Sequence, residues 1–271
     1  MASRLMALSK TSLLRENLLS WRALRRHSVW ILAASATGAV AALFRYLDDW
    51  SIQFSHWLAT VSPWIQPAML FFGMILICQL RDRFFRGSDG TGIPQAIAAL
   101  KIEDGPARDN VLSWRILIGK GLLLAIGLFA GMTIGREGPS VHAGACFMYL
   151  SNRWGNFQSW LVQRGLILAG GAAGIAAAFN TPIAGVIFAL EEIGRSFEKN
   201  NAGTIVRTVL VACLVCMTFF GDYLFYGKLD TRLEQPLEWL IVPVLGVVFG
   251  LLGGLFAQSL LLTTRPYGRF Y

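Results

Sequence analysis

The residues most capable of chemistry in this sequence are charged side chains placed beside helix-breaking residues at the end of an apolar stretch. Arg136 and Glu137 follow such a stretch and precede Gly138 and Pro139 in the segment GREGPSVHAG (135–144). A charged side chain at the centre of a membrane helix costs about 3 kcal/mol or more. We therefore expect a functional Glu137 if the segment lies deep in a membrane, whereas a loop at the membrane surface would leave both charges merely solvated.

Proline marks three places where apolar segments are interrupted and a new helix is expected to start. The segments are GTGIPQAIAALK (90–101), GREGPSVHAGACFMYL (135–150) and NTPIAGVIFALEE (180–192). Proline is favoured in the first helical turn, and Asn180 or Thr181 is a suitable N-cap for the third helix. Irregular backbone at membrane depth occurs only where it is buried in protein or lines a cavity. These interruptions are therefore expected to surround an internal site.

Helix starts of this kind predict a binding site for an anion. The first N–H groups of a helix have no intrahelical acceptor, and the helix start carries roughly half a positive charge. Gly135 and Gly138 would let the backbone approach a ligand closely. We expect the backbone N–H groups around Arg136 and Glu137 to face the break, where they would hold either a dissolved anion or the Glu137 carboxylate itself.

The elements that must position these residues are membrane-spanning helices. Hydrophobic residues make up 55% of the 271-residue chain, charged residues make up 15%, and the mean hydropathy is +0.53. An apolar run of about 18 residues or more can span a bilayer as a helix. The stretches that reach or approach this length are 30–47, 57–80, 116–135, 160–179, 203–220 and 238–262. The alternating pattern of a membrane β-barrel is absent, so we predict an all-α polytopic membrane protein.

The distribution of positive charge predicts the orientation of the chain in the membrane. Basic residues are concentrated before the first span and again in RDRFFRG (81–87), whereas LDDWSIQFSHW (47–57), interpreted as the turn between the first two spans, has no Lys or Arg. Cytoplasmic loops carry the positive excess. We therefore expect a cytosolic basic segment at 1–27, a transmembrane domain at 28–271, and a cytoplasmic N-terminus in an inner or plasma membrane. Nucleic-acid binding is not expected, because the basic residues flank membrane segments.

Several residues of types that bind metals are interpreted as packing residues. Cys213 and Cys216 form a C-x-x-C, but within VLVACLVCMTFF, which is too apolar for a redox or zinc site. The histidines are too scattered to form a metal site, and they are His27, His56 and His142. We interpret His142, which is close to the break, as a hydrogen-bonded packing residue. Small residues expected at helix contacts are Gly170, Gly171 and Gly174. No nucleophile-elbow or zinc-protease motif occurs, and we expect no enzymatic activity.

Three motifs together resemble those of the CLC family of chloride channels and proton–chloride antiporters. GREGPSV (135–141) is similar to the family's G-[KR]-E-G-P, GTGIP (90–94) to its G-S-G-I-P, and GGAAGIAAAFNTPIAGVIFALEEI (170–193) to the segment that follows. They occur in the family's order and at similar spacing, and the resemblance covers about residues 28–262. It implies an all-α fold with broken helices, similar to the first inverted repeat of the CLC chloride channel fold.

The resemblance also implies roles for individual residues. Glu137 would be the external gate that takes up protons from the outer side, and Glu192 would pass protons to the cytoplasm. An interfacial ion pair with Arg195 is the alternative for Glu192. The residues implied in anion binding are Thr91, Gly92, Ile93, Gly135, Arg136 and Gly138. Lys120 would hold anions electrostatically, or alternatively extend its ammonium group to the membrane surface.

The sequence departs from the family pattern in two side chains and in length. Thr91 stands where the family usually has Ser, which keeps the hydroxyl donor and adds a methyl group. His142 stands where the family's antiporters usually have Gln. The second repeat of the family supplies a G-x-F-x-P motif and a Tyr hydroxyl to the chloride site, and no G-x-F-x-P follows residue 200. The sequence is therefore expected to hold the first repeat, with the second repeat absent.

Three interpretations of function remain open at the level of sequence. A carboxylate at Glu192 favours proton-coupled chloride antiport across an inner or plasma membrane. The alternatives are passive conduction by a chloride channel of the voltage-gated type, and a truncated, transport-inactive chain. The expected ligands are chloride and protons, with membrane lipid around the protein and no metal or cofactor. The family architecture implies a homodimer with contacts near 182–192 and 203–220, or a separate subunit that supplies the second half.

Overall fold

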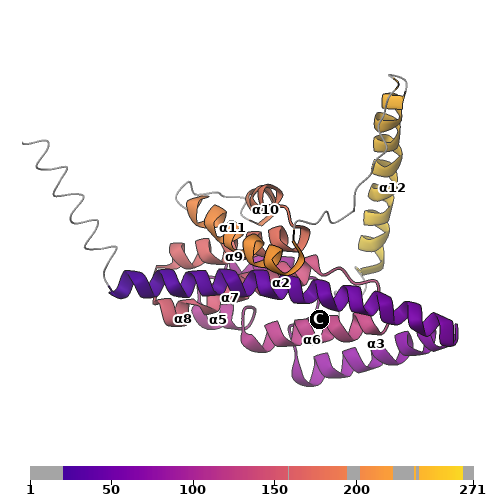
Figure 1. The fold of residues 1–271 in the computed structure, drawn as a ribbon, viewed down its shortest axis with the longest axis horizontal. Coiled ribbons are helices and arrows are strands. Elements are labelled where there is room, and N and C mark those ends of the chain that lie inside the picture. The colour runs from indigo at the N-terminus through magenta and orange to yellow at the C-terminus, as the bar shows by residue number, and fades with distance from the viewer. Residues whose placement is uncertain (1–20, 158, 194–201, 222–234, 236–237, 265–271) are drawn as a thin grey trace, which may run out of the picture. The chain divides into compact units, whose positions relative to one another are not determined.

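The computed structural model describes residues 21–157, 159–193, 202–221, 235 and 238–264. These residues form helices and connecting segments, and no strand occurs among them (Figure 1). The chain divides into two units, Met1–Phe225 and Tyr226–Tyr271. The first unit contains α2 (Trp21–Val61), α3 (Ile65–Phe84), α4 (Ile93–Ala99), α5 (Gly105–Asp109), α6 (Trp114–Phe129), α7 (Glu137–Leu150), α8 (Asn152–Gly155), α9 (Trp160–Phe179), α10 (Pro182–Phe188), the π-helical turn η1 (Ala189–Ile193) and α11 (Ala202–Phe220). The second unit contains the 3-10 turn η3 (Glu238–Leu240) and α12 (Ile241–Thr264).

Six helical stretches within the described residues are long and apolar enough to cross a membrane, which confirms the predicted all-α membrane fold. They are Trp21–Val61, Ile65–Phe84, Gly105–Phe129, Trp160–Phe179, Ala202–Phe220 and Ile241–Thr263. The helices that start at the predicted interruptions are shorter, with 7 residues in α4, 14 in α7 and 7 in α10. A helix must reach about 20 residues to cross the hydrocarbon core, so these three begin or end inside the protein.

The turn between the first two spans lies further along the chain than the sequence suggested. Helix α2 continues through residues 47–57 to Val61, and the turn to α3 occupies residues 62–64. The acidic residues that suggested a loop are accommodated by ion pairs, because Arg45 Nε lies 3.5 Å from Asp49 Oδ2 one helical turn later. With 41 residues, α2 is about 60 Å long, which is about twice the hydrocarbon thickness. Most of the predicted basic segment 1–27 lies outside the described residues.

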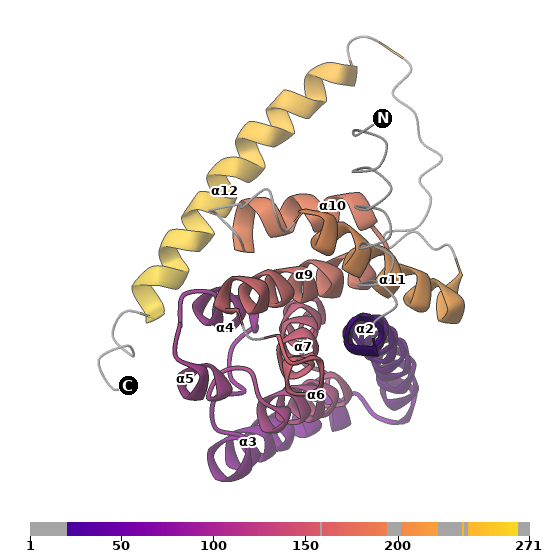
Figure 2. The same ribbon diagram turned by 90° about the vertical axis from the view of Figure 1, so that its left-hand side faces the viewer.

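The core of the first unit is the contact between α7 and α9, where glycines let the two backbones touch. A Cβ atom added to Gly170 would collide with the carbonyl group of Gly144, and one added to Gly174 would collide with that of Ser140. Figure 2 shows α7 between α9 and α6, and the residues of α7 are buried along nearly all of its length. Gly171 packs similarly, with its added Cβ 3.0 Å from Ile193 Cδ1. These contacts confirm the predicted helix-packing glycines.

A second close contact joins α2 to α11 and explains the C-x-x-C sequence. A Cβ atom added to Gly38 of α2 would collide with the carbonyl of Ala212 of α11. Cys213 and Cys216 beside it are buried free thiols, and Cys216 Sγ donates to the carbonyl of Ala177 in α9 at 3.4 Å. The two cysteines therefore pack helices together, as their apolar surroundings predicted.

The second unit contains a long apolar helix. Helix α12 has 24 residues, and its described side chains, including Leu251 and Phe256, are exposed. An apolar surface of this kind is typical of a helix that faces lipid or packs on another membrane helix.

Candidate anion and proton site

The starts of α4 and α7 lie against each other, although the two motifs are far apart in the sequence. A Cβ atom added to Gly138 would be 2.5 Å from the carbonyl oxygen of Thr91, and one added to Gly92 would be 2.6 Å from His142 Cβ. Gly92 has a φ of +104°, a left-handed conformation that glycine adopts without strain. Only glycine therefore fits at both Gly92 and Gly138, and the close approach of the two helix starts depends on them.

Both helix starts present backbone N–H groups that precede the first intrahelical hydrogen bond. In α7 that bond runs from Ser140 N to Arg136 O at 3.0 Å, so the N–H groups of Glu137 and Gly138 precede it. In α4 the corresponding bond runs from Ala96 N to Gly92 O at 3.0 Å. No side chain within the described part of the chain caps either helix. These N–H groups and the helix dipoles favour a negative charge at this place.

The carboxylate of Glu137 lies back over the irregular segment that precedes its own helix. Its Oε2 atom is 2.5 Å from the position that a Cβ atom on Gly135 would take, and the side chain is half-buried. Gly135 and Thr91 are exposed on the surface of the unit. An acidic side chain therefore stands at the α7 start, beside a region that a dissolved anion can reach.

Lys120 is buried and holds the segment that leads into Thr91. Its Nζ atom donates to the carbonyl of Gly90 at 3.0 Å and to that of Asp89 at 3.3 Å, and its side chain is 5% exposed. Gln95 of α4 donates from Nε2 to the same Asp89 carbonyl at 2.5 Å. The ammonium group therefore remains inside the protein close to the start of α4, and it does not extend to the membrane surface.

The side chain of Arg136 joins the break to helix α2. It is 6% exposed, and its Nε atom lies 3.9 Å from Oδ2 of Asp48. The Arg136 carbonyl also accepts a hydrogen bond from Ser140 Oγ at 2.8 Å. The sequence did not reveal Asp48 as a partner, although an acidic residue in a long apolar stretch is a signal that a basic partner is close by.

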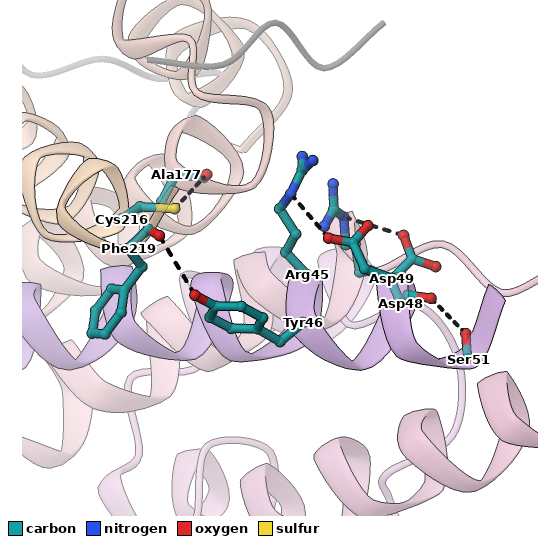
Figure 3. A network of polar contacts seen from close by, with 9 residues as sticks. Arg45, Tyr46, Asp48, Asp49, Ser51, Ala177, Cys216 and Phe219 are labelled. Carbon is teal, nitrogen blue, oxygen red and sulfur yellow. Dashed lines mark hydrogen bonds and ion pairs between the residues drawn. The ribbon is translucent and has the colours of Figure 1, made fainter. Parts of the chain in front are cut away.

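Further polar contacts close to Asp48 lie along α2 and reach α11 (Figure 3). Arg45 and Asp49, which flank Asp48 in α2, form an ion pair, and Ser51 Oγ donates to the Asp48 carbonyl at 2.8 Å. The hydroxyl of Tyr46 reaches the carbonyl of Phe219 in α11 at 3.5 Å. The Arg136–Asp48 ion pair thus connects the segment before α7 to polar contacts that involve α2 and α11.

A cavity of about 420 Å³ lies beside this segment. It is lined by Asp48 and His56 of α2, by Gln66 of α3 and by residues 131–134, which lead directly into Gly135. Polar and titratable groups therefore surround the approach to the Glu137 break from this side.

The remaining residues singled out from the sequence are His142 and those at the start of α10. His142 is fully buried, and its ring donates from Nε2 to the carbonyl of Val111 at 3.1 Å, which confirms a hydrogen-bonded packing residue. The backbone contacts at Gly92 and Gly138 join the starts of α4 and α7, which are two of the three predicted helix starts. The third helix, α10, packs on α9 through Gly185. Asn180 ends α9 in the left-handed conformation, and Thr181 is the N-cap residue of α10, although its side chain makes no capping hydrogen bond.

Glu192 lies on the π-helical turn η1, which follows α10 and contacts α9. Its side chain, and Arg195 with it, fall outside the described part of the structure. The proton-transfer role of Glu192 therefore stays a prediction.

Comparison with known proteins places these features in a family. The family model described as voltage gated chloride channel matches residues 73–269. The chain is 34% identical to the chloride channel protein CLC-d of Arabidopsis thaliana over 74% of its own length and 28% of that protein. It is 33% identical to the H(+)/Cl(-) exchange transporter ClcA of Citrobacter koseri over 70% of its own length and 39% of that protein.

A structural comparison agrees with the sequence comparison. The crystal structure of a slow cyanobacterial Cl−/H+ antiporter superposes with a TM-score of 0.72 and 25% sequence identity, over 90% of this chain and 58% of the other. The chain thus spans between about a quarter and three fifths of the relatives that it matches. The family model covers more than half of the chain, the motifs occur in order, and the chain therefore belongs to the voltage gated chloride channel family, known as CLC.

Proposed function

We propose that this chain is a chloride transport protein that exchanges chloride for protons across a membrane. The observation that carries the proposal is the contact between the starts of α4 and α7, with the Glu137 carboxylate lying over the break. Exposed N–H groups at a helix start favour chloride and carboxylate alike. One site would therefore serve two competing negative groups.

In the proposed mechanism Glu137 alternates between two positions. As a carboxylate it occupies the electropositive start of α7 and excludes chloride. When it takes up a proton, it loses its charge and most of its attraction to the N–H groups, so it moves aside and chloride enters. When the proton leaves, the carboxylate returns and displaces the anion. Where the proton enters from the outer side and leaves through Glu192 to the cytoplasm, and the displaced chloride leaves to the outer side, each cycle would move a proton and chloride in opposite directions.

Other residues would support this cycle. Thr91, Gly92 and Ile93 would contribute the α4 side of the anion site, and Gly135, Arg136 and Gly138 would contribute the α7 side. Lys120 would add positive charge from its buried place beside the α4 start. Glu192 would transfer protons between Glu137 and the cytoplasm.

The names of the relatives support proton–chloride exchange, and one of them also supports passive chloride conduction as the alternative. The ClcA relative is named an H(+)/Cl(-) exchange transporter and the matched crystal structure is that of a Cl−/H+ antiporter, while the plant relative is named a chloride channel protein. Passive chloride conduction is the second candidate because of that plant relative. The two differ in one measurement, since only exchange couples a chloride gradient to proton movement.

The test uses the purified full chain in liposomes loaded with chloride. We expect that a chloride gradient will drive protons in the direction opposite to chloride flux, recorded with a pH electrode. In Glu137→Gln the neutral side chain should abolish proton movement and leave chloride flux. Glu191→Gln is the control, because it neutralises an exposed glutamate that lies outside the proposed site and should leave the coupling intact. Chloride flux without proton movement in the unaltered chain would favour passive conduction, and no chloride flux would contradict both candidates.

We also propose that the N-terminus is cytoplasmic and that lipid or a second copy of the chain covers α10 and α11. The basic residues at the start of α2 and at the end of α3 support a cytoplasmic N-terminus. Large apolar side chains on α10 and α11, such as Ile183 and Leu214, are exposed and would be covered by lipid or by a second copy of the chain. Cysteine accessibility at positions near Arg22 in sealed vesicles would test the orientation.

A further inference from the structure

A cavity separate from the candidate anion site lies at the end of the first unit where α2, α9 and α11 begin. Its volume is about 520 Å³, and its lining comes from the N-terminal parts of these three helices and from Phe157 and Ser159 before α9. Figure 2 looks onto the end of the unit where α2 begins. None of the residues lining this cavity belongs to the proposed chloride and proton site. The cavity therefore needs an explanation of its own.

The rim of this cavity is basic. Arg26 and His27 of α2 and Arg207 of α11 line it, and no carboxylate is among its described lining residues. Arg26 donates from Nη2 to the carbonyl of Asn156 at 3.4 Å, and Arg207 donates from Nε to that of Gly203 at 2.9 Å. A guanidinium group has five N–H donors in a planar fork, so each retains donors suited to the oxygens of a phosphate.

The inner walls of the cavity are apolar. Trp30 of α2 forms part of the lining, and its indole Nε1 donates to Thr208 Oγ1 of α11 at 3.1 Å, which joins the two helices. The guanidinium carbon of Arg207 lies 5.8 Å from the centre of the Trp30 ring. Leu161 of α9 also lines the cavity and is 52% exposed, so the apolar wall reaches the outer surface of the unit.

We propose that this cavity binds an anionic phospholipid, with the phosphate between Arg26 and Arg207 and an acyl chain along Leu161 and Leu166. Basic pockets between membrane helices are suited to acidic lipid head groups, and a nearby apolar wall suits the chain of the same molecule. A free phosphate ion would use the rim and leave the apolar wall without a partner. The lipid would link α2, α9 and α11 at the end predicted to face the cytoplasm.

The first measurement needs no variant. Purified full chain in detergent is titrated with dioleoyl phosphatidylglycerol and with dioleoyl phosphatidylcholine, and bound lipid is counted by native mass spectrometry. We expect phosphatidylglycerol to bind at least tenfold more tightly. Inorganic phosphate and glycerol 3-phosphate are added as competitors, and millimolar concentrations should leave the bound lipid in place. Equal binding of the two lipids would overturn the proposal, and displacement by inorganic phosphate would replace it with a soluble phosphate site.

The second measurement locates the site. The double variant Arg26→Gln, Arg207→Gln should bind phosphatidylglycerol about thirtyfold more weakly, since each basic residue near a membrane surface contributes about 1 kcal/mol to acidic lipid binding. The matched control is Arg22→Gln, Arg25→Gln, which removes two exposed arginines that do not line the cavity. The control should bind within about twofold of the unaltered chain. An equal loss in both variants would show general charge attraction and overturn the proposed site. Size-exclusion profiles of both variants check that they remain folded, and if the double variant does not fold, the lipid comparison on the unaltered chain decides.

Discussion

Glu137 combines two properties that the proposed coupling requires, namely a titratable charge and a place beside uncapped backbone donors. Its Oε2 atom lies close to Gly135, immediately before the first turn of α7. A carboxylate near a helix start gains about 0.3–1 kcal/mol from the dipole, and up to about 2 kcal/mol where the geometry is partly buried. This gain disappears when the side chain is protonated. A balance of this size is small enough for proton uptake to reverse, which an exchanger needs.

Asp48 is predicted to stabilise Arg136 and, through it, the segment before α7. Asp48→Asn removes the carboxylate 3.9 Å from a guanidinium group that is largely buried. Removing one partner of a fully buried pair costs about 3–5 kcal/mol, and because the Asp48 side chain is 33% exposed we expect about 1–2 kcal/mol. The measurement is the free energy of unfolding in detergent by chemical denaturation.

The matched control for that change is Asp49→Asn. The Asp49 carboxylate is 41% exposed and pairs with Arg45 within the same helix. Exposed pairs one helical turn apart contribute about 0.3–0.5 kcal/mol, so the control should change stability little. Equal losses in the two variants would contradict a special role for the contact between Asp48 and Arg136.

Lys120 is predicted to shape the α4 side of the anion site. Lys120→Met keeps the length of the side chain but removes the ammonium donors to the carbonyls of Gly90 and Asp89. This change removes a positive charge beside the anion site and releases the segment that leads into Thr91, so chloride affinity should fall by about tenfold. Calorimetric titration of the protein with chloride measures this. Lys101→Met, which alters an exposed lysine, should leave chloride affinity unchanged, and an unaltered affinity in Lys120→Met would contradict the role.

At the scale of elements, the site depends on short helices that stop inside the protein. Helix α4 has 7 residues and α7 has 14, and each starts where a glycine allows another backbone to approach. The long helices α2 and α9 pack on α7, and α9 also contacts α4. Broken helices can persist in a membrane only where their irregular connections are buried in protein or line a cavity. The position of the α7 start therefore follows from how α7 packs on α9.

The contact between α7 and α9 gives a prediction at this scale. In Gly170→Ala the added methyl group would collide with the carbonyl of Gly144, and α7 and α9 must move apart. Overpacking of this kind costs about 1–3 kcal/mol. We expect a loss of that size in the free energy of unfolding, together with weaker chloride binding, because the start of α7 would shift relative to α4.

A control glycine occurs within α6. The Cβ atom of Gly121→Ala would lie 3.6 Å from Phe44 Cε1, which is an ordinary contact. Replacing glycine by alanine in a helix gains about 0.5–1 kcal/mol when there is space. Gly121→Ala should therefore be neutral or stabilising. A stabilising effect at both positions would contradict the backbone contact between α7 and α9.

At the scale of the whole molecule, the first unit presents the proposed anion site with one side open. Thr91 and Gly135 are exposed, whereas Gly92, Arg136 and Gly138 are buried. Chloride that has lost its water needs donors around it, because an ion transferred to an apolar environment without partners is strongly destabilised. The chain covers 58% of the antiporter whose structure it matches. The liposome experiment reports whether the chain transports chloride by itself.

Much of the architecture could be predicted because it depends on local patterns. Apolar runs of membrane length predicted the spans, proline within apolar surroundings predicted the starts of α4, α7 and α10, and small residues predicted the contact at Gly170. The local pattern was misleading at 47–57, where acidic residues suggested a turn. There, ion pairs along α2 and across to Arg136 allow the helix to continue to Val61.

The sequence by itself determined the class of protein and the helix breaks, and it singled out Glu137 as the candidate gate. Hydropathy, proline and the identity of a motif are properties of neighbouring residues. Only the tertiary structure decided which breaks meet, that Asp48 pairs with Arg136, that Lys120 holds the Gly90 segment, and that Arg26 and Arg207 share a cavity. These contacts join residues on different helices. Their formation depends on how closely whole helices approach one another, and the order of residues along the chain does not contain that distance.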